Sequence, residues 1–158
     1  MLLLAVALVA QMGGFPQPIT GPLINTVLYL SDLLVGSWSG IIIGICTPVI
    51  AFMRSILPPP LGPMIPFIAL GNGVLVVVFS QLKGKNKILG IIIASLVKYL
   101  ILFTAVSYIV DVPDKIAQIM SLPQLFTALS GGAIAILAYK ALWVIGIDRI
   151  KETPKDIK

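Results

Sequence analysis

Long runs of apolar residues dominate the chain, and short clusters of proline, glycine or lysine separate them. Apolar runs approaching about 20 residues are typical of helices that cross a bilayer, and proline and glycine clusters mark where such helices end. The pattern therefore predicts an all-α membrane protein, built as a compact bundle of six transmembrane helices. We expect these helices at about residues 2–14, 23–35, 41–56, 64–82, 88–110 and 123–146. Residues 1–158 then form a single domain with a tail at 147–158.

The boundaries rest on the breakers between the runs. Residues 15–22 hold three prolines and no charge, and residues 36–40 are expected to form a tight turn. Three consecutive prolines at 58–60 end the third run, and a short amphipathic piece before Leu122 precedes the last one. Residues 1–14 lack the basic start of a signal peptide, so we expect a retained first helix.

Composition agrees with a membrane protein and excludes other classes. Among 158 residues, 58% are hydrophobic, and only 11 basic and 6 acidic residues are present. Soluble domains carry about 25% charged residues, and disordered chains need still more charge to stay solvated. A soluble domain and a disordered chain are therefore both excluded.

The placement of the lysines predicts the orientation of the bundle. Lys83, Lys85 and Lys87 lie between the fourth and fifth runs, and Arg149 and Lys151 belong to a basic tail after the sixth. Because basic residues near helix ends prefer the cytoplasmic side, six helices place both clusters and both termini in the cytoplasm. The net charge of +5 is then a topology signal, and nothing in its pattern indicates nucleic-acid binding.

Four charged residues fall inside the expected spans: Asp32, Arg54, Lys98 and Lys140. A charge at the centre of a span costs about 2.5–3.5 kcal/mol on insertion scales, so each one needs a reason. Lys98 lies almost at the middle of its run and is either a substrate-binding cation or a structural partner for a buried carboxylate or carbonyl. Arg54, near the outer end, either binds substrate or extends to the interface. Together they favour an anionic ligand, whereas Asp32 and Lys140 are expected to pair with each other or to anchor at the interface.

Several uncharged polar residues are weaker candidates. Asn72 lies in mid-span between two glycines, which allow a ligand or another backbone to approach closely. Asn25 is expected to make a helix–helix hydrogen bond, the commoner use of such a residue. Tyr108 and Gln124 belong to the fifth and sixth helices.

Small residues recur at intervals of four. Gly36, Gly40 and Gly44 form one such series, and Ala128 and Gly132 form another. Small residues four apart make a flat helix face on which another helix packs closely. We expect these faces to serve the bundle itself or an external membrane partner.

The sequence lacks the signatures of an enzyme, a metal site or a nucleotide site. It has no histidine, a single cysteine (Cys46) and no phosphate-binding GxxxxGK[ST] motif. Neither catalysis nor a cofactor is therefore expected. Asp32 is the one acid within the expected spans, and it lies near one end, whereas a gradient-driven carrier usually needs a mid-membrane acid. Active transport would then draw energy from a partner.

Two local motifs resemble the substrate-binding S components of energy-coupling factor (ECF) transporters. Residues 61–72, Leu-Gly-Pro-Met-Ile-Pro-Phe-Ile-Ala-Leu-Gly-Asn, resemble the entry into the fourth helix of these proteins. The Pro-Gln-Pro-Ile-Thr-Gly-Pro stretch at residues 16–22 resembles the segment that follows their first helix. The size and the expected six helices resemble the family over nearly the whole chain.

The resemblance implies a function and a set of partners. The protein would capture a vitamin or related micronutrient from outside a prokaryotic cell membrane and hand it over for ATP-driven uptake. Its partners would be the small-molecule substrate, a transmembrane coupling (T) subunit and two cytoplasmic ATPase subunits. The site would lie in the outer half of the bundle and involve Gln17, Thr20, Asn72, Lys98 and Tyr108, with Arg54 at the rim. The Ala-x-x-x-Ala face that the family uses toward the coupling subunit is not present in that form on the first helix.

Two other classes of function remain open from the sequence. One is a small self-sufficient carrier that works as a homo-oligomer. The other is a membrane subunit of a larger complex that binds no small molecule.

Overall fold

The computed structural model describes residues 2–12 and 17–144, and within these ranges the regular structure is entirely helical. The helices are α1 (Leu2–Met12), α2 (Gln17–Leu34), α3 (Ser37–Met53), α4 (Ile65–Leu82), α5 (Lys87–Thr104), α6 (Asp114–Ile119) and α7 (Leu122–Val144). A 3₁₀ segment, η1 (Pro59–Met64), leads into α4, and a π-helical segment, η2 (Ala105–Ile109), ends α5. The expected basic tail, with Arg149 and Lys151, lies outside the described residues.

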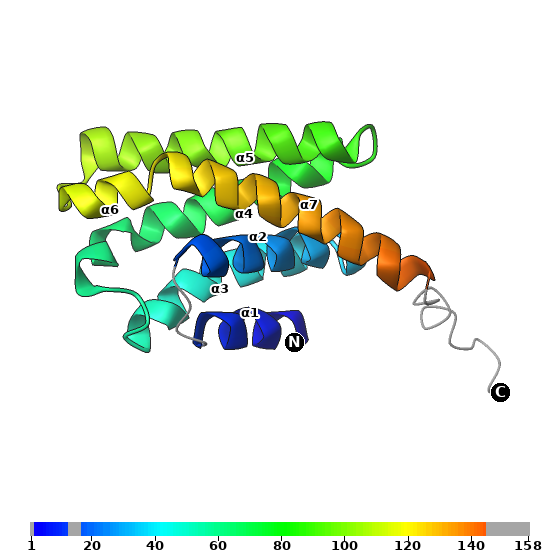
Figure 1. Ribbon diagram of the computed structural model, residues 1–158, viewed down its shortest axis with the longest axis horizontal. Helices are drawn as coiled ribbons and strands as arrows, with labels where there is room; N and C mark the ends of the chain where they lie inside the picture. Colours follow the sequence, from blue (N-terminus) through cyan, green and yellow to red (C-terminus); the bar gives the residue numbers. More distant parts are fainter. Residues whose placement is uncertain (1, 13–16, 145–158) are drawn as a thin grey trace.

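Five helices close a ring, and α1 packs against its outside (Figure 1). Around the ring, α2 contacts α7, α7 contacts α5, α5 contacts α4, α4 contacts α3, and α3 returns to α2. Helix α1 packs on α2 and α3. The bundle has two ends, which we name by their loops. The proline end holds residues 54–64 and 110–121, and the lysine end holds residues 83–87 (Figure 1).

The prediction of a loop at residues 15–22 is wrong from Gln17 onward, because α2 begins at that residue. Pro18 lies in the first turn, where backbone N–H groups have no partner within the helix and proline costs little. Pro22 lies further inside α2, and its carbonyl accepts a hydrogen bond from Thr26 Oγ1 at 2.8 Å. Helix α2 is therefore longer than expected, and its first turns bring Thr20 and Gly21 to the cavity described below.

The turn expected at residues 36–40 is also shorter than predicted. Val35 and Gly36 make it, the glycine with a φ of 121° that favours this residue, and α3 begins at Ser37. Helix α3 ends at Met53, before the expected boundary. The amphipathic piece before Leu122 forms the six-residue helix α6.

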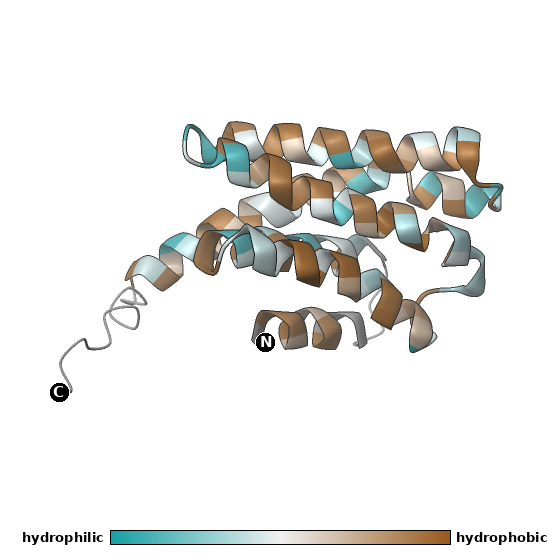
Figure 2. Cartoon of the chain, turned by 180° about the vertical axis from the view of Figure 1, so that it is seen from behind, coloured by the Kyte–Doolittle hydropathy of each residue, from teal (hydrophilic) through white to brown (hydrophobic). Residues whose placement is uncertain are grey.

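Three helical stretches are long and apolar enough to cross a membrane: Pro59–Leu82, Lys87–Ile109 and Asp114–Val144. Helix α3 is apolar but has 17 residues. In the view of Figure 2, hydrophobic residues cover most of the helix surface, and hydrophilic residues lie at both ends of the bundle and at a few places along the helices. Large apolar side chains such as Leu100, Phe126 and Leu137 are exposed. An apolar surface of this extent is unfavourable in water and is typical of contact with lipid.

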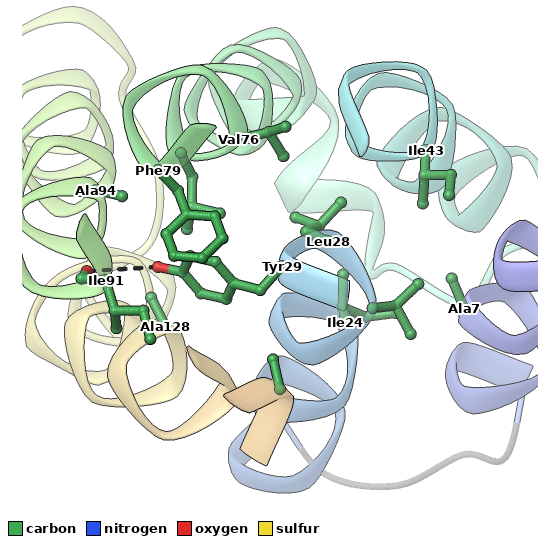
Figure 3. Packing of buried hydrophobic residues seen from close by; sticks show 13 residues of the cluster. Ala7, Ile24, Leu28, Tyr29, Ile43, Val76, Phe79, Ile91, Ala94 and Ala128 are labelled. Carbon is green, nitrogen blue, oxygen red and sulfur yellow. Dashed lines mark hydrogen bonds between the residues drawn. The ribbon is translucent and has the colours of Figure 1, made fainter. Parts of the chain in front are cut away.

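The main core lies inside the ring. Tyr29 of α2 points between α4 and α5, where its ring meets Phe79 edge-on at a centroid distance of 4.8 Å (Figure 3). Its hydroxyl lies 3.0 Å from Ser95 Oγ and donates toward the backbone oxygen of Ile91. A buried phenol usually finds such a partner. A second core cluster, around Leu61, Met64, Leu102, Ala105 and Met120, supports the proline end.

Candidate functional site

A cavity of about 320 Å³ lies toward the proline end, between the helices of the ring. The start of α2, residues 56–58 and 61, and the end of α6 line it, together with residues of α3, α4, α5 and α7. Its polar lining residues are Thr20, Asn25, Asn72, Lys98 and Gln124. Most of its remaining wall is aliphatic, including Ile24, Ile56, Leu57, Leu61, Ile68 and Met120.

The most polar part of the cavity is built around Lys98 of α5. The side chain is 3% exposed, and its Nζ donates two hydrogen bonds of 2.7 Å each, to Asn25 Oδ1 and to Asn72 Oδ1. A buried ammonium group is costly unless such partners replace water. Lys98 therefore joins α5 to α2 and to α4 at one point. Among the described residues that line the cavity, it is the only ionisable one.

Each asparagine is itself held by a backbone carbonyl. Asn25 Nδ2 donates to the backbone oxygen of Gly21 at 2.9 Å and lies 3.5 Å from Thr127 Oγ1. Asn72 Nδ2 donates to the backbone oxygen of Gly44 at 3.0 Å. Because a carbonyl only accepts, it turns each amide nitrogen away from Lys98 and each amide oxygen toward it. The lysine thus meets two oriented dipoles.

Glycines bring the neighbouring backbones close enough for this arrangement. A Cβ added at Gly44 would lie 2.9 Å from Asn72 Cβ, and one added at Gly131 would lie 2.6 Å from Asn25 Cβ. Both positions exclude a side chain. Of the expected small residues, Gly40, Gly44 and Gly132 pack inside the bundle, since a Cβ at Gly132 would meet Ile91 at 2.5 Å. Gly36 lies in the turn before α3, and nothing lies within 4 Å of its added Cβ.

The structure brings together three of the six residues that the sequence nominates for a site. Lys98, Asn72 and Thr20 line the cavity. Gln17 begins α2, and its side chain lies outside what the structure describes. Arg54 is exposed directly after α3 and does not line the cavity. Tyr108 is 81% exposed and does not line it either, because η2 turns its side chain outward.

Two further polar residues line the cavity. Asn25 was expected to make a helix–helix hydrogen bond; it contacts α7 and also holds Lys98. Gln124 is buried, and its Nε2 donates to the backbone oxygen of Ile119 at 3.4 Å. The sequence signal for both residues is an uncharged polar side chain in an apolar run. That signal does not say which helix face is buried.

The charged residues near the lysine end form a different contact from the one expected. Asp32 is fully buried, and Lys83 Nζ lies 2.9 Å from its Oδ2 and donates to its backbone oxygen at 2.8 Å. The predicted pairing of Asp32 with Lys140 is therefore wrong, and Lys140 is exposed on α7. The structural role expected for Asp32 has Lys83 as its partner.

No group of three histidine, cysteine, aspartate or glutamate side chains that could hold a metal ion occurs within residues 2–12 and 17–144. What the cavity offers chemically is binding: one cation, three amides, one hydroxyl and an aliphatic wall. No nucleophile with a neighbouring base lies among the described residues that line it.

Comparison with known proteins adds one match. A family model described as "ECF transporter, substrate-specific component" matches residues 2–145. No curated protein and no solved structure gives a significant match.

Proposed function

The chain belongs to the substrate-specific components of ECF transporters, and from this premise we propose that it captures a small anionic micronutrient in the cavity around Lys98. Members of this family are substrate-binding membrane subunits. The vitamin-like nature of the substrate, its capture from outside and its handover for ATP-driven uptake are parts of the proposal.

The observation that carries the proposal is the buried ammonium of Lys98 at the wall of a cavity. Its two described partners are neutral amides, so its positive charge is not neutralised by any carboxylate among the described residues. A charge held inside an apolar bundle is expensive and is a functional site by default. An anionic ligand would supply the missing charge.

The direction of capture follows from the two ends of the bundle. The cavity lies toward the proline end, whereas Lys83, Lys85 and Lys87 gather at the opposite end. Because basic residues near helix ends favour the cytoplasm, we place the cavity toward the outside of a prokaryotic cell membrane. In this arrangement the six longer helices span the membrane with both termini in the cytoplasm, α1–α3 being short spans held by their neighbours.

The energy for transport would come from partner proteins. The sequence has no phosphate-binding motif, and the buried Asp32 is paired with Lys83 rather than placed in the cavity. The family implies association with a transmembrane coupling subunit and ATPase subunits, and we propose two ATPase subunits in the cytoplasm. The present chain would then need only to bind and release.

Native mass spectrometry of the full chain purified in lipid nanodiscs tests the proposal. We expect a bound small molecule that leaves on unfolding and is identified in negative-ion mode. Lys98→Met should remove it, and Lys140→Met, a change at an exposed lysine of another helix, should not. A wild-type protein that neither carries nor takes up any small molecule would contradict the proposal.

The handover is tested separately, by co-expression with coupling and ATPase subunits from the same genome. We expect a stable complex that accumulates the identified molecule in vesicles only when ATP is supplied. Uptake by this chain alone would favour the self-sufficient carrier.

A further inference from the structure

We propose that the ligand of the cavity is a compact aliphatic monocarboxylate that carries a hydrogen-bond donor at its far end. This inference rests on the proposed function and names the chemical class of its substrate. Three properties of the cavity carry it: its free N–H groups, its free carbonyl group and its aliphatic wall.

The first property is an excess of donors beside Lys98. An ammonium group has three N–H donors, and the described residues accept two of them, through Asn25 and Asn72. Asn72 Nδ2 has two N–H donors, of which Gly44 accepts one. The oxygens of both asparagines already face the ammonium. A group that binds here must therefore accept hydrogen bonds and carry negative charge, as a carboxylate does.

The amount of charge distinguishes a carboxylate from a phosphate. Lys98 is the one ionisable residue among the described residues that line the cavity, so the cavity supplies a single positive charge. A phosphate monoester near neutral pH carries about two negative charges, and the second would be buried without a partner at high cost. A monocarboxylate matches the charge of the site.

The second property is the free carbonyl oxygen of Gln124. Its amide nitrogen donates to the backbone oxygen of Ile119 and contacts the sulfur of Met120 at 3.9 Å. These long contacts engage the amide nitrogen, and no described residue donates to Oε1, which remains as an acceptor. Gln124 approaches the cavity from α7 beside α6, whereas Lys98 approaches it from α5. A ligand that reaches both groups needs an acceptor at one end and an O–H or N–H donor at the other.

The third property is the rest of the cavity wall, which is mostly aliphatic. Isoleucine, leucine, methionine and proline supply most of it, and no aromatic side chain is among the described lining residues. Flat heterocycles gain much of their affinity by stacking on aromatic rings, and this wall does not provide that contact. The cavity of about 320 Å³ lies at the small end of the roughly 300–1,000 Å³ typical of ligand pockets, which favours a compact ligand.

Five probes of one chain length separate these properties: hexanoate, ω-hydroxyhexanoate, hexanamide, hexylammonium and hexyl phosphate. Each is added at equal millimolar concentration to the wild-type protein in nanodiscs after removal of any bound molecule, and affinity is derived from the shift in unfolding temperature. We expect hexanoate to bind at least tenfold more tightly than hexanamide, hexylammonium or hexyl phosphate. We expect ω-hydroxyhexanoate to bind about fivefold more tightly than hexanoate, the effect of one net hydrogen bond.

Two variants assign the preferences to residues. In Lys98→Met the advantage of hexanoate over hexanamide should disappear, so that the two probes bind with about equal affinity. In Gln124→Met the advantage of ω-hydroxyhexanoate over hexanoate should disappear. The wild-type probe ranking decides the matter even where a variant does not fold.

The failures of the two proposals are distinguishable. Preference for hexylammonium or hexyl phosphate, or hexanoate binding that survives Lys98→Met unchanged, overturns the monocarboxylate and leaves a substrate-binding subunit. Equal binding of hexanoate and ω-hydroxyhexanoate overturns the role of Gln124. A protein that binds none of the probes and carries no co-purified molecule contradicts the proposed function as well.

Discussion

Lys98 Nζ lies 2.7 Å from Asn72 Oδ1 across the interface between α5 and α4. The partner of this buried cation is an amide and not a carboxylate, so the contact orients the ammonium without neutralising it. Asn25 makes the same contact from α2. Lys98 therefore has no counter-ion among the described residues, and we propose that a ligand supplies one.

Replacing Lys98 by methionine should separate stability from binding. Methionine fills a similar volume and removes the buried charge, but two amide oxygens lose a donor, at about 1–3 kcal/mol each. Relief of the buried charge offsets part of this loss, so we expect a net change of about 2 kcal/mol or less in the free energy of unfolding. Tryptophan fluorescence during thermal unfolding measures it, with Lys140→Met as control. A much larger loss would mean that Lys98 mainly holds the fold together.

Replacing Asn72 by aspartate should place a carboxylate where we expect that of the ligand to act, and so weaken ligand binding. A carboxylate 2.7 Å from Lys98 would neutralise the charge that we assign to the ligand, and we expect hexanoate to bind at least tenfold more weakly. Asn72→Leu, which removes the hydrogen bond without adding charge, serves as the comparison. Similar binding by the aspartate variant and the wild type would argue against anion capture at this lysine.

Gly44 should not accept even one methyl group. Its added Cβ would lie 2.9 Å from Asn72 Cβ, and such overpacking costs about 1–3 kcal/mol. The displaced Asn72 should also weaken ligand binding. Gly73→Ala is the matched control on α4, because nothing lies within 4 Å of its added Cβ, and we expect it to raise stability by about 0.5–1 kcal/mol. Equal effects of the two changes on unfolding temperature would contradict this packing.

Removing Lys83 should lower the free energy of unfolding more than removing its partner Asp32. The Asp32 side chain is fully buried, whereas that of Lys83 is 26% exposed. Lys83→Met strands a buried carboxylate, and we expect a loss of about 3 kcal/mol. Asp32→Asn leaves a lysine that reaches water, and we expect a loss of about 1 kcal/mol. Unfolding temperatures, with exposed Lys85→Met as control, would refute this account if the order were reversed.

Arg54 and Tyr108 should be dispensable for binding, although the sequence nominates both. They are exposed and do not line the cavity. We expect Arg54→Ala and Tyr108→Phe to change the affinity for hexanoate by less than about twofold, an effect below 0.5 kcal/mol. A tenfold loss in either variant would place the site closer to the surface than the cavity around Lys98.

The sequence anticipated the helices better than their ends. Apolar runs locate α4, α5 and α7 closely, because hydrophobic length is read directly from composition. It missed the start of α2, since the prolines at 18 and 22 read as breakers although the first of them lies in a helical first turn. It also missed the partner of Asp32, because Lys83 is distant in sequence and lies in what reads as a polar loop.

For the site, the residue types alone marked Lys98 and Asn72, because a charge and an amide in an apolar run are both costly and therefore conspicuous. Asn25 was assigned to helix packing, and Gln124 was only a weak candidate. Thr20 was nominated through a family resemblance and lines the cavity, whereas Arg54 and Tyr108 do not. The difference lies in which helix face each side chain occupies.

By itself, the sequence determined that the chain is an all-helical membrane protein and that Lys98 needs a buried partner, because both follow from the cost of apolar surface in water and of charge in lipid. Only the tertiary structure decided that the partners of Lys98 are Asn25 and Asn72, 73 and 26 residues away. It also placed these groups at the wall of one cavity. Close approach at Gly44 and Gly131 made this possible, and such approach depends on how whole helices pack rather than on any local pattern.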